Sequence, residues 1–136
     1  NAIKDVYKTD VFSMARWRNT ARPDGGLRPL GPVIPENIIT KAPTAELKPG
    51  QKDQDTLPPY EVFDDILRGL IEEEHGIPAI AARGHAPELV RRVWGMLDRA
   101  EYKRHQAAPG VKISARSFGR ERRYPITNHF SRIVGR

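Results

Sequence analysis

The sequence contains no cysteine among its 136 residues, which excludes a disulfide framework and a thiolate zinc site. It has no apolar run near the ~18 residues that a membrane-spanning helix needs, and its first ten residues lack the apolar segment of a signal peptide. Apolar residues make up only 38% of the chain, which begins with Asn instead of Met. We therefore expect a soluble intracellular protein that is processed or partial, and neither a membrane protein nor a disulfide-rich secreted domain.

Basic charge is concentrated at the C-terminal end. Residues 103–136 hold nine Lys and Arg against one acid, Glu121, whereas residues 1–102 hold fourteen basic and sixteen acidic residues. A basic tail on a near-neutral body indicates a polyanionic partner, such as nucleic acid, a phosphate-rich ligand or an acidic surface. A tail that is merely solvated explains the charge equally well, so composition leaves both interpretations open.

Hydrophobic periodicity predicts three amphipathic helices and one short helix. The expected helices cover residues 10–19 with Thr9 as N-cap, residues 58–76 with Gly76 as the stop, residues 78–83, and residues 87–101 or beyond. A short strand is expected at residues 111–114. These helices are too few and too interrupted to close a bundle, so we expect their apolar stripes to pack on an element absent from this chain, such as a sheet.

A long irregular segment separates the first two predicted helices. Residues 20–59 hold eight of the twelve prolines, a Pro-Asp-Gly-Gly turn at 23–26 and a polar run at 48–56. Forty residues of this kind are too many for a passive connection in a compact domain. The segment is therefore expected to be a long flexible loop with a functional role, or a disordered one.

Three groups of residues, in order along the chain, resemble a known family. They are Lys-Asp-Val-Tyr-Lys-Thr-Asp-Val-Phe at 4–12, then Lys-Ala-Pro-Thr-Ala-Glu-Leu at 41–47 with Asp-Gln-Asp-Thr-Leu-Pro-Pro-Tyr at 53–60, and Glu-Tyr-Lys-Arg at 101–104 with Phe-Gly-Arg-Glu-Arg-Arg-Tyr-Pro-Ile-Thr-Asn at 118–128. Over essentially the whole chain, this order and spacing resemble the C-terminal part of NAD synthetases, and are most similar to the bacterial glutamine-dependent form.

The resemblance implies an α/β fold, a Rossmann-like nucleotide-binding synthetase domain. Residues 1–136 would supply mainly its C-terminal helices, the long loop at 20–59 and the basic tail at 103–136. The family's Ser-Gly-Gly-x-Asp-Ser loop, which grips the ATP pyrophosphate, does not occur in this sequence. We therefore expect a C-terminal fragment that is inactive alone.

The implied activity is that of a ligase, the ATP-dependent amidation of deamido-NAD to NAD. ATP adenylates the nicotinate carboxylate, pyrophosphate leaves, and ammonia from a glutaminase domain attacks the acyl-adenylate. The resemblance also implies Mg²⁺ held mainly by residues outside this chain, a homo-oligomer and a cytoplasmic location, with no nucleic-acid or membrane partner. The alternative from the residues alone is a basic nucleic-acid-binding module built on the tail.

Five residues match functional positions of the family. Lys8 and Thr44 match ATP-binding residues, Asp53 a catalytic loop carboxylate, and Tyr102 and Lys103 a pair that contacts deamido-NAD. The chemistry suits these roles, since ammonium groups pair with phosphates and hydroxyls donate to them. The alternatives are a solvated lysine at a helix start for Lys8, a threonine that caps a turn for Thr44, and a solvated loop acid for Asp53.

Two positions depart from the family pattern. Gln54 stands where the family usually has Glu, and His105 stands where it often has Arg. These changes put a second loop carboxylate in doubt and replace a fixed cation by a pH-dependent donor. The four histidines have no metal-ligand spacing, so no metal site is expected within the chain.

Overall fold

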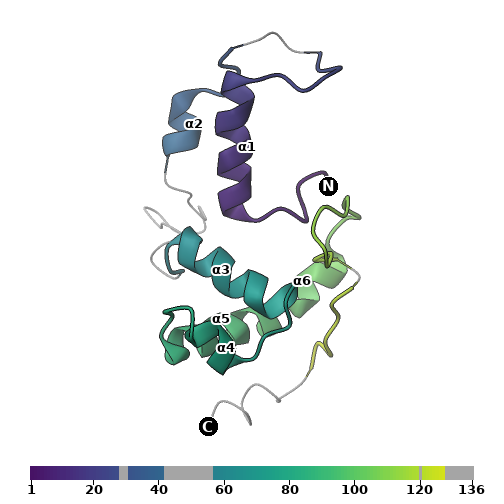
Figure 1. The fold of residues 1–136 in the computed structure, drawn as a ribbon. Helices are drawn as coiled ribbons and strands as arrows, with labels where there is room; N and C mark the ends of the chain where they lie inside the picture. Colours follow the sequence, from purple (N-terminus) through teal and green to yellow (C-terminus); the bar gives the residue numbers. More distant parts are fainter. Residues whose placement is uncertain (28–30, 42–56, 120, 128–136) are drawn as a thin grey trace, which may run out of the picture. The chain divides into compact units, whose positions relative to one another are not determined.

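A computed structural model describes residues 1–27, 31–41, 57–119 and 121–127 (Figure 1). The chain divides into two compact units, one formed by Asn1–Val6 with Glu61–Arg136 and the other by Tyr7–Tyr60. Within the described ranges the regular structure is entirely helical. The helices are α1 (Lys8–Thr20), α2 (Glu36–Thr40), α3 (Tyr60–Ile71), α4 (Ile77–Ala81), α5 (Pro87–Arg99) and α6 (Glu101–Gln106).

In the unit formed by Tyr7–Tyr60, α1 packs with the short helix α2. The predicted first helix is confirmed, but it begins two residues earlier, at Lys8, with Tyr7 as N-cap in place of Thr9. Asn19 ties the end of α1 to the segment before α2, because its side chain accepts from the backbone N–H groups of Val33 and Ile34 at 3.0 and 2.9 Å. The irregular segment at 20–59 therefore contains a helix that its composition did not predict.

The other unit has its core between α3, α4 and α5. Four fully buried side chains form the centre of this core: Ile66 of α3, Ile80 of α4, and Val90 and Val93 of α5. Those of α3 and α5 belong to the apolar stripes that predicted the two helices, whereas the short helix α4 was predicted from the proline and glycine at its ends. The close approach of α3 to α4 depends on Gly69, where an added Cβ would lie 2.9 Å from Ile80 Cγ1.

The end of α3 differs from the prediction. The helix stops at Ile71, and Glu74 takes the left-handed conformation with φ of 54°, so Gly76 is not the stop but the N-cap of α4. The exposed acids after α3 are paired across the unit, Glu73 with Arg83 and Glu74 with Arg116. These ion pairs offer a physical reason for a non-glycine residue in this turn.

Two predictions at the C-terminal end are corrected. The last helix does not run on through Glu101, because α5 ends at Arg99 and α6 follows as a separate short helix after Ala100. The strand expected at 111–114 does not form, since the backbone N–H groups of Ile113 and Ser114 donate to the Asp5 carboxylate and not to a neighbouring strand.

The expected α/β class is supported only in its helical part. No strand occurs among residues 1–27, 31–41, 57–119 and 121–127. In the same ranges, no helix is long and apolar enough to cross a membrane.

Candidate functional site

Helix α6 presents two opposite faces with different roles. Tyr102 and Lys103, the pair matched to deamido-NAD, are exposed, and Tyr102 retains 43% of its accessible surface. Glu101 and Arg104, three residues apart and therefore on one helix face, are buried. The buried pair anchors α6 in its unit, which leaves Tyr102 and Lys103 available on its outer face.

The Glu101 carboxylate is the centre of a buried polar cluster, and only 1% of this residue is exposed. It pairs with the Arg104 guanidinium and lies 3.1 Å from His105 Nε2. Burial by itself raises the pKa of Glu101, but hydrogen bonds from Arg104, the Tyr124 backbone N–H and His105 outweigh it and hold the pKa below its usual value. Glu101 therefore stays ionised at neutral pH.

Arg104 connects α6 to residues 118–122, farther along the chain. Its Nη2 donates to the Arg122 carbonyl at 2.8 Å, and its guanidinium carbon lies 5.0 Å from the centroid of the Phe118 ring. Arg122 is also buried, and its guanidinium stacks 4.2 Å from the centroid of the Tyr124 ring. Burial lowers the pKa of Arg122, with the nearby Arg104 cation acting in the same direction. Two cations thus share a buried space with one carboxylate.

A second buried carboxylate, Asp5, binds residues 113–118 of the tail. Asp5 Oδ2 accepts from the backbone N–H groups of Ile113 and Ser114 and from Ser114 Oγ, each at 2.8 Å, and Oδ1 accepts from the Phe118 N–H at 2.6 Å. Burial by itself raises the pKa of Asp5, but these donors outweigh it and the pKa lies below its usual value. The N-terminal segment therefore holds a turn more than 100 residues away.

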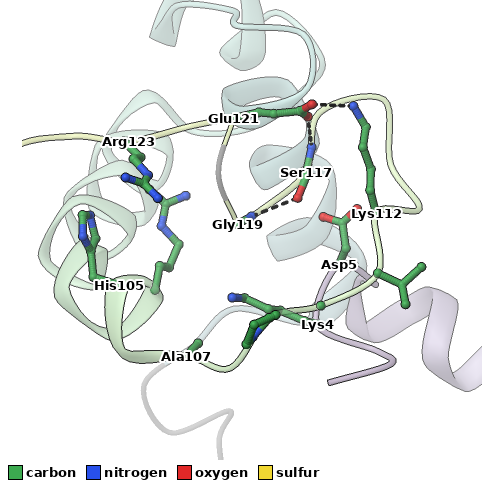
Figure 2. A pocket seen from close by; sticks show the side chains of 13 residues that line it. Lys4, Asp5, His105, Ala107, Lys112, Ser117, Gly119, Glu121 and Arg123 are labelled. Atoms are coloured by element: carbon green, nitrogen blue, oxygen red, sulfur yellow. Dashed lines mark hydrogen bonds and ion pairs between the residues drawn. The ribbon is translucent and has the colours of Figure 1, made fainter.

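The same segment and the tail enclose a cavity of about 510 Å³ beside α6 (Figure 2). Figure 2 shows His105 and Arg123 on one side of this cavity and Lys112 and Glu121 on the other. Lys4 also lines it, and its ammonium donates to the Ala108 carbonyl at 2.9 Å. Tyr102 and Lys103 do not line this cavity, so the structure does not bring the predicted deamido-NAD pair into it.

Lys8, the residue matched to ATP phosphates, is the first residue of α1 and is exposed. Its ammonium lies 5.9 Å from the centroid of the Phe12 ring and 5.8 Å from that of Tyr60. Aromatic faces at this distance attract a cation, so the two rings hold the ammonium near the start of the helix. Lys8 belongs to one compact unit and Tyr102 and Lys103 to the other.

Thr44 and Asp53 lie outside the described residues, as does the rest of the segment at 42–56. No group of three or more His, Asp or Glu side chains that could hold a metal ion occurs in the part of the chain that the structure describes.

Sequence reasoning assigned no role to Asp5, Glu101 and Arg104, although all three lie inside the motifs quoted for the resemblance. Two of them are acids beside basic residues, a pattern that also fits a solvated surface. One signal could have identified the two acids. The tail has nine cations and only one acid of its own, so its cations need partners such as Asp5 and Glu101 elsewhere in the chain.

Comparisons with known proteins give a consistent result. A model of the family described as NAD synthase matches residues 1–107. The glutamine-dependent NAD(+) synthetase of Xanthomonas campestris is 51% identical over 129 residues, which cover 95% of this chain and 22% of that protein. The enzyme of the same name from Thermotoga maritima is 54% identical over 128 residues, covering 94% of this chain and 21% of that protein.

A solved structure agrees with these relatives. The glutamine-dependent NAD+ synthetase from Acinetobacter baumannii, in complex with ADP, aligns with a TM-score of 0.50 and 45% identity, covering 90% of this chain and 19% of that one. The chain thus spans about a fifth of the length of the relatives it matches.

Proposed function

The chain belongs to the NAD synthase family, and from this membership we propose that it forms part of a glutamine-dependent NAD synthetase. The observation that carries the proposal is the close sequence identity to enzymes of that name over nearly the whole chain. The likeness includes both compact units and the exposed pair on α6. The reaction would be the ATP-dependent amidation of deamido-NAD, a ligase reaction.

Lys103 and Tyr102 would contact deamido-NAD. Their support is geometric, because both are exposed while the neighbouring Glu101 and Arg104 are buried and fix the orientation of the helix. An ammonium group on a rigid helix can pair with an anionic group of the dinucleotide without a large ordering cost. The Tyr102 ring would contribute packing to the same ligand.

Lys8 and Thr44 would bind ATP, and Asp53 would act at the reacting carboxylate. Lys8 suits a role at the phosphates, because negative charge grows on pyrophosphate as it leaves and a fixed ammonium stabilises that charge. The two rings beside Lys8 limit the freedom of its side chain. The ADP in the solved synthetase supports a nucleotide-binding role for the family.

The nucleotide would first activate the nicotinate carboxylate as an acyl-adenylate, which ammonia then attacks. Neither the phosphate loop for ATP nor a cysteine nucleophile for glutamine hydrolysis occurs in the 136 residues. The Rossmann-like sheet, Mg²⁺ and the glutaminase would therefore belong to a longer protein, a cytoplasmic homo-oligomer in which this chain completes the dinucleotide site. Alone, the chain would be inactive.

The test is steady-state kinetics of the full-length synthetase with ammonia as the nitrogen donor, which bypasses glutamine hydrolysis. Lys103→Ala should lower kcat/KM for deamido-NAD at least about thirtyfold, or ~2 kcal/mol, the range for a charge-assisted hydrogen bond in a desolvated site. The KM for ATP should change much less. Arg99→Ala is the matched control, since Arg99 is an exposed cation at the end of α5.

Two results would contradict the proposal. Failure of the full-length protein to form NAD from deamido-NAD and ATP would remove the function itself. Unchanged kcat/KM in Lys103→Ala, in an otherwise active enzyme, would show that Lys103 is an ordinary solvated lysine.

A further inference from the structure

The ammonium group of Lys8 lies near two aromatic rings that are far apart in the sequence. Phe12 follows Lys8 by one turn of α1, and Tyr60 is the first residue of α3. The Lys8 Nζ atom lies 5.9 Å from the centroid of the Phe12 ring and 5.8 Å from that of Tyr60. All three residues belong to the compact unit formed by Tyr7–Tyr60. Both rings lie in quoted motifs, at 4–12 and 53–60, yet sequence reasoning gave neither of them a role.

The three side chains differ in burial. Lys8 is exposed, whereas Phe12 and Tyr60 are half-buried. A fully solvated lysine samples many rotamers, and fixing its side chain against a ligand costs conformational entropy. Two rings that are partly held by their own surroundings attract the ammonium and restrict its positions. Part of the ordering of Lys8 is therefore complete before a ligand binds.

Aromatic rings can hold an ammonium group without neutralising its charge. A carboxylate partner cancels that charge, as Glu121 does for Lys112 at 2.6 Å. A ring carries no net charge and attracts the cation through its quadrupole. Lys8 therefore keeps its positive charge for phosphate oxygens, with which an ammonium forms strong charge-assisted hydrogen bonds.

We propose that Phe12 and Tyr60 are positioning residues for Lys8, which hold its ammonium where it meets the phosphates of ATP. This inference rests on the ATP-binding role proposed above for Lys8 and extends it to two residues that act through the ammonium. Their contribution is largest as pyrophosphate leaves, because a cation that is already in place stabilises the growing negative charge without rearrangement.

The test is a double-mutant cycle in the full-length synthetase, with ammonia as the nitrogen donor. The two-ring variant, Phe12→Leu/Tyr60→Leu, removes both rings but keeps apolar, helix-forming side chains, and Lys8→Met removes the ammonium. The changes are made separately and together, and kcat/KM for ATP is measured for each protein. Titration calorimetry with ATP, without deamido-NAD, adds a readout that does not depend on amidation.

Two control variants accompany the cycle. Phe12→Tyr/Tyr60→Phe keeps both rings and changes only their hydroxyl groups. Trp17→Leu removes an exposed ring elsewhere on α1. Both controls should stay within about twofold of wild type in kcat/KM for ATP.

We expect the two-ring variant to lower kcat/KM for ATP at least about fivefold, the range for losing two exposed cation–π contacts, and to weaken ATP binding. Lys8→Met should lower kcat/KM for ATP at least about tenfold. When Lys8 is already Met, removing the rings should change kcat/KM by less than about twofold, because the group through which they act is absent. The KM for deamido-NAD should change little in all of these variants.

Three outcomes would overturn the inference. The first is a two-ring variant within about twofold of wild type in both readouts. The second is an equal loss with and without Lys8, which would show that the rings support the fold or act through Arg16, whose guanidinium carbon lies 6.0 Å from the centroid of the Phe12 ring. The third is a loss in Phe12→Tyr/Tyr60→Phe as large as that in the two-ring variant.

Failure of the proposed function gives a different result. A wild-type protein that forms no NAD would contradict the function, and the ATP titrations of the same variants would still test the rings. Unchanged kinetics and ATP binding in Lys8→Met would remove the role of Lys8, and this inference with it, while NAD synthesis itself would stand.

Discussion

The Asp5 carboxylate allows a sharp test of how the N-terminal segment holds the tail. It accepts four hydrogen bonds, from the N–H groups of Ile113, Ser114 and Phe118 and from Ser114 Oγ. Each hydrogen bond to a charged group contributes about 1.5–3 kcal/mol. The full sum overestimates the effect, because Ile113 is exposed and its amide would bind water once released.

We therefore expect Asp5→Ala to lower the free energy of unfolding by about 3–4 kcal/mol. Asp5→Asn should cost about 1–2 kcal/mol, since its carbonyl oxygen keeps one acceptor but loses the charge and the second oxygen. The assay is urea denaturation followed by circular dichroism. Amide hydrogen exchange adds a local measurement, in which Ile113, Ser114 and Phe118 lose protection first. Asp24→Asn, in an exposed turn, is the control.

The pH dependence provides an independent check. Because the pKa of Asp5 is lower in the folded state than its unfolded value of about 3.9, its contribution is complete above that value and is lost as the pH falls through the folded pKa. The difference in the free energy of unfolding between wild type and Asp5→Asn should thus be constant from pH 5 to 8 and become smaller below pH 4. Two results would refute this account of Asp5. One is a free energy of unfolding for Asp5→Ala within about 0.5 kcal/mol of wild type. The other is a difference between wild type and Asp5→Asn that stays the same in acid.

Three further substitutions test the packing of the same unit by urea denaturation. Gly69→Ala should destabilise by about 1–2 kcal/mol, because its Cβ would meet the buried Ile80 at 2.9 Å, whereas Gly95→Ala, which meets only the end of an arginine side chain, should stabilise by about 0.5–1 kcal/mol. Equal effects would contradict this account of the α3–α4 contact. Glu101→Gln should cost about 3–5 kcal/mol, since it leaves the buried Arg104 unpaired, and a loss below 1 kcal/mol would show that water reaches the cluster.

The helices that the sequence predicted correctly are those whose signal is local. Ile66 and Leu70, or Val90 and Val93, repeat at helical spacing, and their buried or half-buried positions in the core follow from that spacing. Proline at the start of α5 and the glycine with φ of 100° after α4 mark boundaries by fixed backbone preferences.

One error occurs where a distant residue decides local structure. The segment at 111–114 has a strand-like sequence, yet Asp5, more than 100 residues away, takes the backbone donors that a strand would need. No periodicity can indicate that pairing. The predicted end of α3 was wrong for a local reason, since Glu74 takes the left-handed conformation with φ of 54° and the His75 N–H donates to the Gly69 carbonyl at 2.8 Å, which closes the helix without a glycine.

The motifs predicted the residues of the candidate site, but they did not predict the side chains that hold its helix in place. Tyr102 and Lys103 were identified by resemblance, and the structure shows them exposed on α6 without testing what they bind. Which side chains hold α6 in place depends on burial. The burial of Glu101 and Arg104 depends on their contacts with Phe118, Arg122 and Tyr124, which a linear sequence does not display.

The basic tail shows why charge counted along a sequence overstates the charge offered to a partner. Arg104 and Arg122 are buried, and Lys112 is paired with Glu121. Because these cations serve the fold, the described part of the tail presents a weaker and less continuous basic surface than its composition predicts, which weakens the basis for a nucleic-acid-binding module.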